Sequence, residues 1–318
     1  MPFMNESPAD YINDAWILQH RPGREHIQPD KPYAVLTEPE HQPDGSTEEV
    51  TTVFLSNREC PFRCLMCDLW RYTLAYTVSP DQLATQVEQG IDLFPQNRHI
   101  KLYNAGSFFD KKAIPPDALA TIAHLLKKQK SILVENHPRL TDDRCLPFRD
   151  ALAGELHIAM GLETVHPKVL PLLNKKMTLA DFARSARFLS KNNIPARAFI
   201  LLRPPFLSEE EGIHWAQKSI DFAHEHGVEC CVVIPTRAGN GAMEKLQQQG
   251  HFAPPSIRAL EEVVEYGISR HHGRVFADLW DLEIFSTCTL CFEKRKSRLE
   301  QMNHHQRKVD AIHCSCSK

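Results

Sequence analysis

The fold class is decided by the apolar run Thr52-Val53-Phe54-Leu55 and by the loop that follows it, Arg58-Glu59-Cys60-Pro61-Phe62-Arg63-Cys64-Leu65-Met66-Cys67-Asp68. The apolar run has the β-branched and aromatic composition of a strand. The loop carries three cysteines with the spacing CxxxCxxC. Three thiolates on one short loop can hold three corners of a cubane iron–sulfur cluster, which leaves the fourth iron open to bind and reduce a small molecule. The alternative is zinc, with a fourth ligand from elsewhere in the chain.

Beyond this loop, short apolar runs alternate with helical patterns. The strand candidates are residues 51–56, 99–104, 132–136, 155–161, 196–202 and 229–234. Helix-capping signals begin the segments between them at Ser79, Thr178 and Ser208. Six such alternations predict an α/β fold, a partial (β/α)6-type TIM barrel whose chemistry lies at the carboxyl ends of its strands. A Rossmann fold would place GxGxxG after the first strand, where this chain has its cysteines.

The 318 residues divide into three parts. Residues 1–50 are rich in Pro, His and acidic residues, and we expect an N-terminal extension that lies on the main domain and has little structure of its own. Residues 51–285 form the barrel core, in which residues 274–285 could add a seventh strand. Residues 286–318 form a small cysteine-rich, metal-binding tail.

Composition limits the cellular setting. The formal net charge of -3 argues neither for nor against an anionic partner. No apolar run approaches the ~18 residues that a membrane span needs, and residues 1–10 lack the pattern of a secretory signal. We therefore expect a cytoplasmic protein without a membrane partner, in which ten cysteines indicate metal or cluster binding rather than disulfides.

A second cysteine set lies in the tail, at Cys288, Cys291, Cys314 and Cys316. Four thiolates complete a tetrahedral zinc site or hold an auxiliary iron–sulfur cluster, and free or redox-active thiols are the third alternative. His304, His305 and His313 are other candidate ligands. The basic run at residues 294–298 could meet phosphates, although a solvated helix face is the simpler interpretation.

The CxxxCxxC loop after the first strand resembles the motif of the radical S-adenosylmethionine (SAM) superfamily. The resemblance implies a [4Fe-4S] cluster on Cys60, Cys64 and Cys67, with SAM chelating the open iron. It also implies reductive cleavage of SAM to a 5′-deoxyadenosyl radical that acts on an organic substrate, with electrons from a protein such as flavodoxin or ferredoxin. One departure is Met66, where the superfamily usually has an aromatic residue.

Other stretches narrow the resemblance to the radical SAM subunit of archaeosine synthase and the broader group of the Elongator catalytic subunit. Asn104-Ala105-Gly106-Ser107-Phe108-Phe109-Asp110 is similar to a Ser-Gly-Ser-Phe-Leu-Asp stretch, and Gly161-Leu162-Glu163 matches a Gly-Leu-Glu stretch. The likeness runs in order from about residue 51 to 265. It implies a tRNA nucleoside as substrate, with tRNA or a partner enzyme subunit as partners.

By the same resemblance, Asn104, Gly106 and Ser107 take the place of a Gly-Gly-Glu stretch that binds the amino group of SAM. Gly106 allows close backbone approach, and Ser107 can donate and accept hydrogen bonds.

Three charged residues end later strands and complete the candidate SAM site. Glu135 and Glu163 can bind the sulfonium, amino group or ribose hydroxyls of SAM, and the guanidinium of Arg203 suits a carboxylate. Structural salt bridges are the alternative for each. We expect a radical SAM enzyme and assign no further catalytic residue. The alternatives are non-catalytic: a zinc or iron–sulfur electron-transfer protein, or a nucleic-acid-binding protein.

Overall fold

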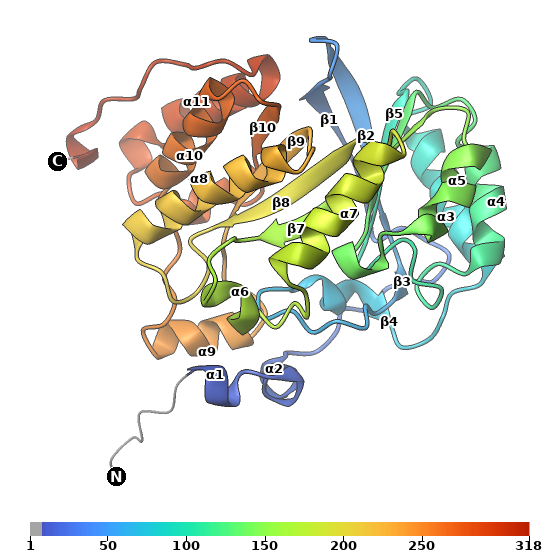
Figure 1. Cartoon of the computed structure of the whole chain (residues 1–318), viewed down its shortest axis with the longest axis horizontal. Helices are drawn as coiled ribbons and strands as arrows, with labels where there is room; N and C mark the ends of the chain where they lie inside the picture. Colours follow the sequence, from blue (N-terminus) through green and yellow to red (C-terminus); the bar gives the residue numbers. More distant parts are fainter. Residues whose placement is uncertain (1–7, 318) are drawn as a thin grey trace.

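The structure is a computed structural model that describes residues 8–317, and its centre is one curled eight-stranded sheet (Figure 1). The strand order is β1-β2-β5-β6-β7-β8-β9-β10. β1 runs antiparallel to β2, and every other neighbouring pair is parallel. The strands are β1 Ala34–His41, β2 Thr47–Leu55, β5 His99–Asn104, β6 Ser131–Glu135, β7 Glu155–Glu163, β8 Ala196–Leu202, β9 Cys230–Pro235 and β10 Arg274–Ala277, with a separate pair, β3 Asn57–Arg58 and β4 Thr73–Leu74.

Helices connect successive strands and cover the outer face of the sheet (Figure 1). The α-helices of the described chain are α1 Pro8–Tyr11, α2 Asp14–His20, α3 Pro80–Leu93, α4 Pro116–Leu125, α5 Leu146–Ala151, α6 Val169–Leu172, α7 Leu179–Lys191, α8 Glu209–Glu225, α9 Ala242–Gln248, α10 Ile257–Ser269 and α11 Thr289–His305; α1 and α2 precede the first strand and α11 follows the last. Capping boxes at Ser79, Thr178 and Ser208 begin α3, α7 and α8. The described part of the chain contains no helix long and apolar enough to cross a membrane.

The α/β half-barrel confirms the predicted fold class. β5 and β8 have the predicted bounds, whereas β2 begins four residues earlier than expected and β7 continues to Glu163. A seventh parallel strand exists as well, although β10 ends at Ala277 rather than near residue 285. The differences lie at strand ends, where local pattern carries the least information.

The expectation that residues 1–50 have little structure of their own is wrong. β1 pairs with β2 over eight residues and extends the sheet. α2 places Ile17 in a second apolar cluster, together with Leu65 of the cysteine loop and Met243 of α9. Figure 1 shows α1, α2 and α9 side by side at one end of the barrel, close to α6. The N-terminal segment thus covers the end of the barrel where the parallel strands finish.

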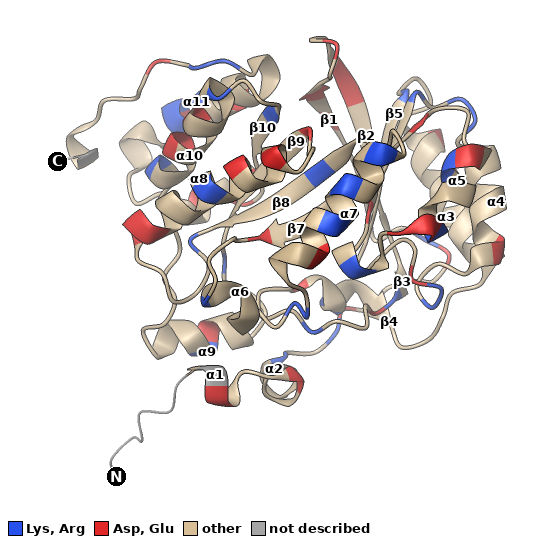
Figure 2. Ribbon diagram, viewed as in Figure 1, with Lys and Arg blue, Asp and Glu red and all other residues tan. Residues whose placement is uncertain are grey.

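β1 also supplies charge to the inside of the barrel. The carboxylate of Glu40 contacts Arg197 of β8 at 2.5 Å and Lys101 of β5 at 2.6 Å, and Glu38 contacts Lys101 at 2.9 Å. Burial opposes ionisation of Glu40, but Arg197 and Lys101 hold its pKa well below the usual range. Figure 2 shows acidic residues along β1. Two buried cations are therefore neutralised by a strand that precedes them by more than 60 residues.

The seam between β1 and β10 is closed by α11. Gln306, just past the end of α11, accepts from the Val275 N–H at 2.7 Å and donates to the Val275 carbonyl at 3.1 Å. Asn303 makes the equivalent pair with Ala277, at 2.8 and 3.0 Å. On the other edge, His41 bonds the His304 carbonyl at 3.0 Å. Side-chain amides thus occupy backbone groups that an exposed edge strand would offer to another chain.

Candidate active site at the barrel mouth

The CxxxCxxC loop lies at the carboxyl end of β2, which is the end where the parallel strands finish. Cys60, Cys64 and Cys67 are free and partly exposed as residues. Burial of the sulfurs raises the pKa of each thiol to about 12. The thiols are therefore protonated without metal, and binding of a cluster must release their protons.

The backbone of this loop is held in place by side chains from distant elements. Asn240 donates from Nδ2 to the carbonyls of Leu65 at 2.8 Å and Cys67 at 3.1 Å. Asn174 donates to the Arg63 carbonyl at 2.6 Å. These hydrogen bonds hold the backbone around Cys64 and Cys67 in place.

The end of β5 offers an unused polar group beside the cysteine loop. Asn104 is 1% exposed, and both polar atoms of its side chain are buried without a hydrogen-bond partner. A Cβ placed on Gly106 would stand 3.5 Å from Nδ2 of Asn104 and 3.6 Å from Cβ of Cys60. Gly106 therefore keeps open the space between the amide and the first cysteine. A buried amide without partners is costly unless a ligand satisfies it.

Ser107 is placed differently from Asn104. Its Oγ is buried and accepts from the His137 N–H at 3.1 Å, which ties the end of β5 to the end of β6. The ring of His137 stacks on Phe62 of the cysteine loop, with centroids 3.7 Å apart. Burial lowers the pKa of His137 to about 3, so the ring is neutral. Ser107 thus ties the end of β5 to the residue that stacks on the cysteine loop.

Glu135 ends β6 and lies inside the mouth. Burial raises the pKa of its carboxyl to about 8, opposed by the backbone of Asn104 and by Lys175 and reinforced by Glu163. The group is therefore mainly protonated at neutral pH. A carboxyl with a strongly raised pKa in a cleft is a candidate functional group.

Glu163 ends β7 in a strained conformation and forms an ion pair. Its φ is +66°, next to a bulge in the pairing with β8. The carboxylate accepts from Nζ of Lys175 at 2.6 Å, and both residues are less than 8% exposed. Burial lowers the pKa of Lys175, but Glu163 and the cysteines outweigh it, so the net shift is upward and the amine is charged. A Cβ on Gly161 would lie 2.1 Å from the Glu163 carboxylate, so glycine makes room for the pair.

Arg203 does not join this group. Its guanidinium contacts Glu209 at 3.0 Å and donates to the Pro254 carbonyl at 2.8 Å. Gly212 of α8 lies against its side chain, since a Cβ there would be 2.8 Å from the Cβ of Arg203. These contacts favour the structural ion pair that the sequence left as the alternative.

Sequence reasoning did not select Lys175, Asn174 or Asn240 as site residues. Asn174 and Lys175 follow α6, and Asn240 lies in the glycine-containing loop after β9. The glycines and Asn240 of residues 235–241 predict a loop that lies over the site, and Asn174-Lys175-Lys176 resembles an Asn-Lys-Gly stretch of the archaeosine synthase subunit. Neither observation assigns a role to these side chains. Their signal is the shared target: all three point at the cysteine loop or at the carboxylates beside it.

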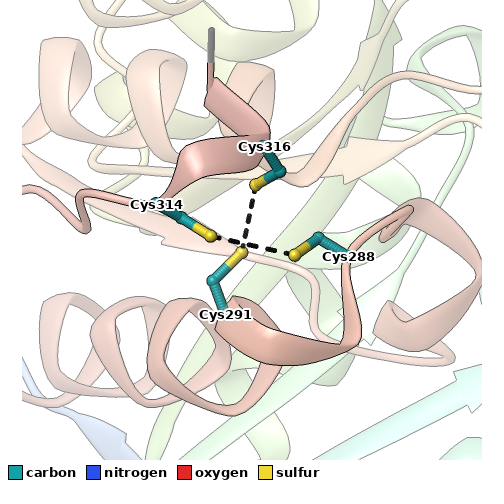
Figure 3. Close-up of side chains that lie close together, drawn as sticks. All are labelled: Cys288, Cys291, Cys314 and Cys316. Atoms are coloured by element: carbon teal, nitrogen blue, oxygen red, sulfur yellow. Dashed lines mark hydrogen bonds between the residues drawn. The ribbon is translucent and has the colours of Figure 1, made fainter.

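The second cysteine set also comes together (Figure 3). The sulfurs of Cys288, Cys291, Cys314 and Cys316 all lie within 4.8 Å of one another. Cys288 and Cys314 are 3.8 Å apart, and Cys291 and Cys316 are 3.5 Å apart. Hydrogen bonds from the backbone and thiol of Cys316 lower the pKa of Cys314 to about 6. A thiol that ionises so easily is ready to bind a metal ion.

The basic run at residues 294–298, between these cysteine pairs, contains both buried and exposed side chains. Arg295 and Arg298 are each 3% exposed and form ion pairs with Glu261 and Glu265 of α10. Lys294 is exposed and Lys296 is partly exposed. The solvated-face interpretation therefore fails for the two arginines, and neither of them is free to meet a phosphate.

Comparisons with known proteins identify the family of this chain. Residues 55–218 match the radical SAM superfamily. Archaeosine synthase subunit beta of Methanosarcina acetivorans is 24% identical over 241 residues, which are 72% of this chain and 69% of that protein. The subunit of the same name from Thermococcus kodakarensis is 26% identical over 171 residues, 52% of this chain and 53% of that protein.

A solved structure supports the fold. The archaeal Elp3 of Methanocaldococcus infernus, with an N-terminal deletion, superposes with a TM-score of 0.52 at 13% identity, covering 70% of this chain and 59% of that one. Because the superfamily match includes the cysteine loop and spans more than half of the 318 residues, the chain belongs to the radical SAM superfamily.

Proposed function

We propose that this chain cleaves SAM at the barrel mouth and directs the resulting radical to a nucleoside of tRNA. The superfamily uses a [4Fe-4S] cluster and SAM. Cys60, Cys64 and Cys67 would hold the cluster, whose chemistry with SAM is a one-electron reductive cleavage to a 5′-deoxyadenosyl radical. What this chain contributes is the position and shielding of these groups.

The observation that carries the proposal is the unpartnered amide of Asn104. It lies within the open space beside Gly106 and Cys60. Both an amide oxygen and an amide N–H₂ are available there, so the amino and carboxylate groups of SAM can each find a partner. An electron-transfer protein would have no use for such a group beside its cluster.

The charged residues of the barrel mouth can supply the other hydrogen bonds and charges beside the cluster and SAM. Glu135, held protonated by burial, can donate a hydrogen bond or ionise beside a cationic ligand. Lys175 places a fixed positive charge near Cys64 and is locked by Glu163. The apolar cluster of α2, α9 and the cysteine loop limits the access of water to the mouth.

The substrate proposal rests on the archaeosine synthase relatives. Their name, archaeosine synthase subunit beta, supports a partner subunit for this chain. We further propose flavodoxin or ferredoxin as electron donor, and the cytoplasm as location because metal-binding cysteines suit a compartment that keeps thiols reduced.

Anaerobic reconstitution tests the reaction class. We expect about four irons at the first site, binding of SAM by calorimetry, and release of 5′-deoxyadenosine with dithionite. Asn104→Ala should keep the iron and weaken SAM binding about tenfold, because one hydrogen-bonding partner is lost. Gln248→Ala on the exposed end of α9 is the control and should change neither quantity.

Two outcomes would reject parts of the proposal. Reconstituted protein with a cluster but without SAM binding would indicate an electron-transfer protein. If bulk tRNA neither stimulates 5′-deoxyadenosine release nor changes in nucleoside composition, the tRNA substrate is wrong while the reaction class stands.

A further inference from the structure

The tail cysteines have the spacing of ligands around one ion rather than around a cluster. Four sulfurs about 2.3 Å from a tetrahedral zinc ion lie about 3.8 Å from one another. The observed separations are 3.8 Å for Cys288 and Cys314 and 3.5 Å for Cys291 and Cys316, with all four within 4.8 Å. A cubane places an iron–sulfide cage between its cysteines, so those sulfurs stand much farther apart.

Charge around the site fits a divalent ion with four thiolates. Such a centre carries a net charge of −2, and Arg295 donates from Nε to the sulfur of Cys291 at 3.4 Å. The same guanidinium pairs with Glu261 of α10. A buried N–H directed at a coordinating sulfur is a typical outer contact of a metal–thiolate site.

The surrounding contacts show what the site holds together. After Gln306 the chain turns back along α11, and Arg298 donates to the carbonyls of Val309 at 2.9 Å and Asp310 at 3.0 Å. The two cysteine pairs lie at the start of α11 and at the end of this returning segment (Figure 3). One ion would therefore close a loop from residue 288 to 316 around α11, the helix that seals the edge of β10.

We infer that Cys288, Cys291, Cys314 and Cys316 bind one zinc ion that fastens the C-terminal segment to α11 and α10. The site is structural, because all four positions of the tetrahedron are taken by protein sulfurs and none is left for a substrate. It is separate from the SAM chemistry and does not depend on it.

The test uses the full chain with Cys60, Cys64 and Cys67 all replaced by Ala, so that the first site cannot contribute metal. We expect about one zinc per chain and no iron by elemental analysis. Growth with cobalt should give the visible bands of tetrahedral cobalt and a sulfur-to-cobalt charge-transfer band. A failure of the proposed SAM reaction would leave these results unchanged.

Further variants locate the ligands. Cys314→Ser in this background should lose the zinc, whereas Cys145→Ala, which removes a buried cysteine that is not in the site, should retain it. Trypsin should cut at the exposed Arg307 and Lys308 severalfold faster after chelation of the zinc, and added zinc should restore resistance.

Three results would overturn the inference. They are iron with cluster absorption in the triple variant, disulfides among the four cysteines in protein prepared under reducing conditions, and tryptic cleavage that is the same with and without metal. The chelation experiment uses the same polypeptide throughout, so it stays decisive even if Cys314→Ser fails to fold.

Discussion

At the scale of single residues, Lys175 and Glu163 form a buried ion pair at the barrel mouth. Each is nearly inaccessible to water, and their charged atoms are 2.6 Å apart. A buried ion pair contributes little net stability compared with apolar residues, but removing one partner leaves an uncompensated charge. The pair is therefore better explained by its place beside Cys64 and Glu135 than by stability.

The substitution Lys175→Met tests the energetic coupling between Lys175 and Glu163. We expect a loss of about 3 kcal/mol in the free energy of unfolding, because the Glu163 carboxylate stays buried without its partner. The double variant Lys175→Met with Glu163→Gln should recover much of that loss while SAM cleavage remains impaired. Urea unfolding of the four proteins in the cycle measures the coupling, and additive effects would contradict it.

Glu135 predicts a pH dependence of stability for the cluster-free protein. Its folded pKa of about 8 lies above the ordinary value of 4.5. A raised folded pKa means that the native state binds the extra proton, so stability is full below pH 4.5 and falls as pH rises through 8. Between pH 4.5 and pH 8, ionisation of Glu135 in the unfolded chain lowers the free energy of unfolding by about 1.4 kcal/mol per pH unit.

Glu135→Gln should remove that slope, because Gln resembles the protonated acid. Urea unfolding at several pH values between 5 and 8 compares the variant with the wild type. If the free energy of unfolding changes with pH in the same way in both proteins, Glu135 titrates normally.

Among the structural elements, the loop after β9 and the cysteine loop act together. Asn240 holds two carbonyls of the cysteine loop and accepts from the Met243 N–H at 2.9 Å, which links the cysteines to the start of α9. Gly241, at φ +85°, lies against the carbonyl of His20 at the end of α2, where a Cβ would be 1.7 Å away. Three segments from separate parts of the chain thus meet at one loop.

Asn240→Asp removes the two donated hydrogen bonds and keeps the accepted one. The new carboxylate would face two carbonyl oxygens and repel them, so the cysteine loop should lose its anchor. We expect the free energy of unfolding to fall by about 1–3 kcal/mol. Iron content after reconstitution and the yield of 5′-deoxyadenosine should both fall severalfold, with Gln248→Ala as the unaffected control. Full iron content in Asn240→Asp would mean that the cysteines order themselves on the cluster.

For the whole molecule, the barrel depends on residues that are remote in sequence. β1 brings Glu40 to Arg197 and Lys101, and α11 joins the edges of β10 and β1. The first and last parts of the described chain therefore both close the same sheet. The domain boundaries expected near residues 50 and 286 remain a prediction, and neither marks a break in the sheet or its cover.

Glu40→Gln tests the closure of the barrel. We expect a loss on the order of 3 kcal/mol or more at neutral pH, because two buried cations lose their shared carboxylate. Glu38→Gln is the matched control on the same strand; its carboxylate is mostly exposed, so it should cost less than about 1 kcal/mol.

The same variant has a pH signature opposite to that of Glu135. The folded pKa of Glu40 is depressed, so its contribution is present above the ordinary value of 4.5 and is lost as pH falls below it. The difference in the free energy of unfolding between the wild type and Glu40→Gln should therefore become smaller at acid pH. An equal difference at pH 7 and pH 4 would exclude an ionised Glu40 as the cause.

The cysteine loop and the parallel strands could be predicted from sequence because their signals are local. Cys60, Cys64 and Cys67 are spaced along one loop, and each parallel strand is a short apolar run beside a capped helix. Asn104 and Gly106, at and just after the end of β5, are assigned from the family resemblance rather than from a local pattern, and their part in binding SAM stays a prediction. In the cysteine loop and in each parallel strand, residues that are close together in the sequence carry the whole pattern.

Tertiary structure alone decided the rest. β1 contains Pro39 between two glutamates, a pattern that argues against a strand until Lys101 and Arg197 are placed opposite it. Lys175, Asn174 and Asn240 contact the cysteine loop or the carboxylate beside it only because separate loops converge there, and Arg203 pairs with Glu209 instead. Sequence determined which groups can bind a cluster, since that depends on spacing along the chain. Which charges accompany them depends on contacts between residues far apart in sequence, and those exist only in the folded barrel.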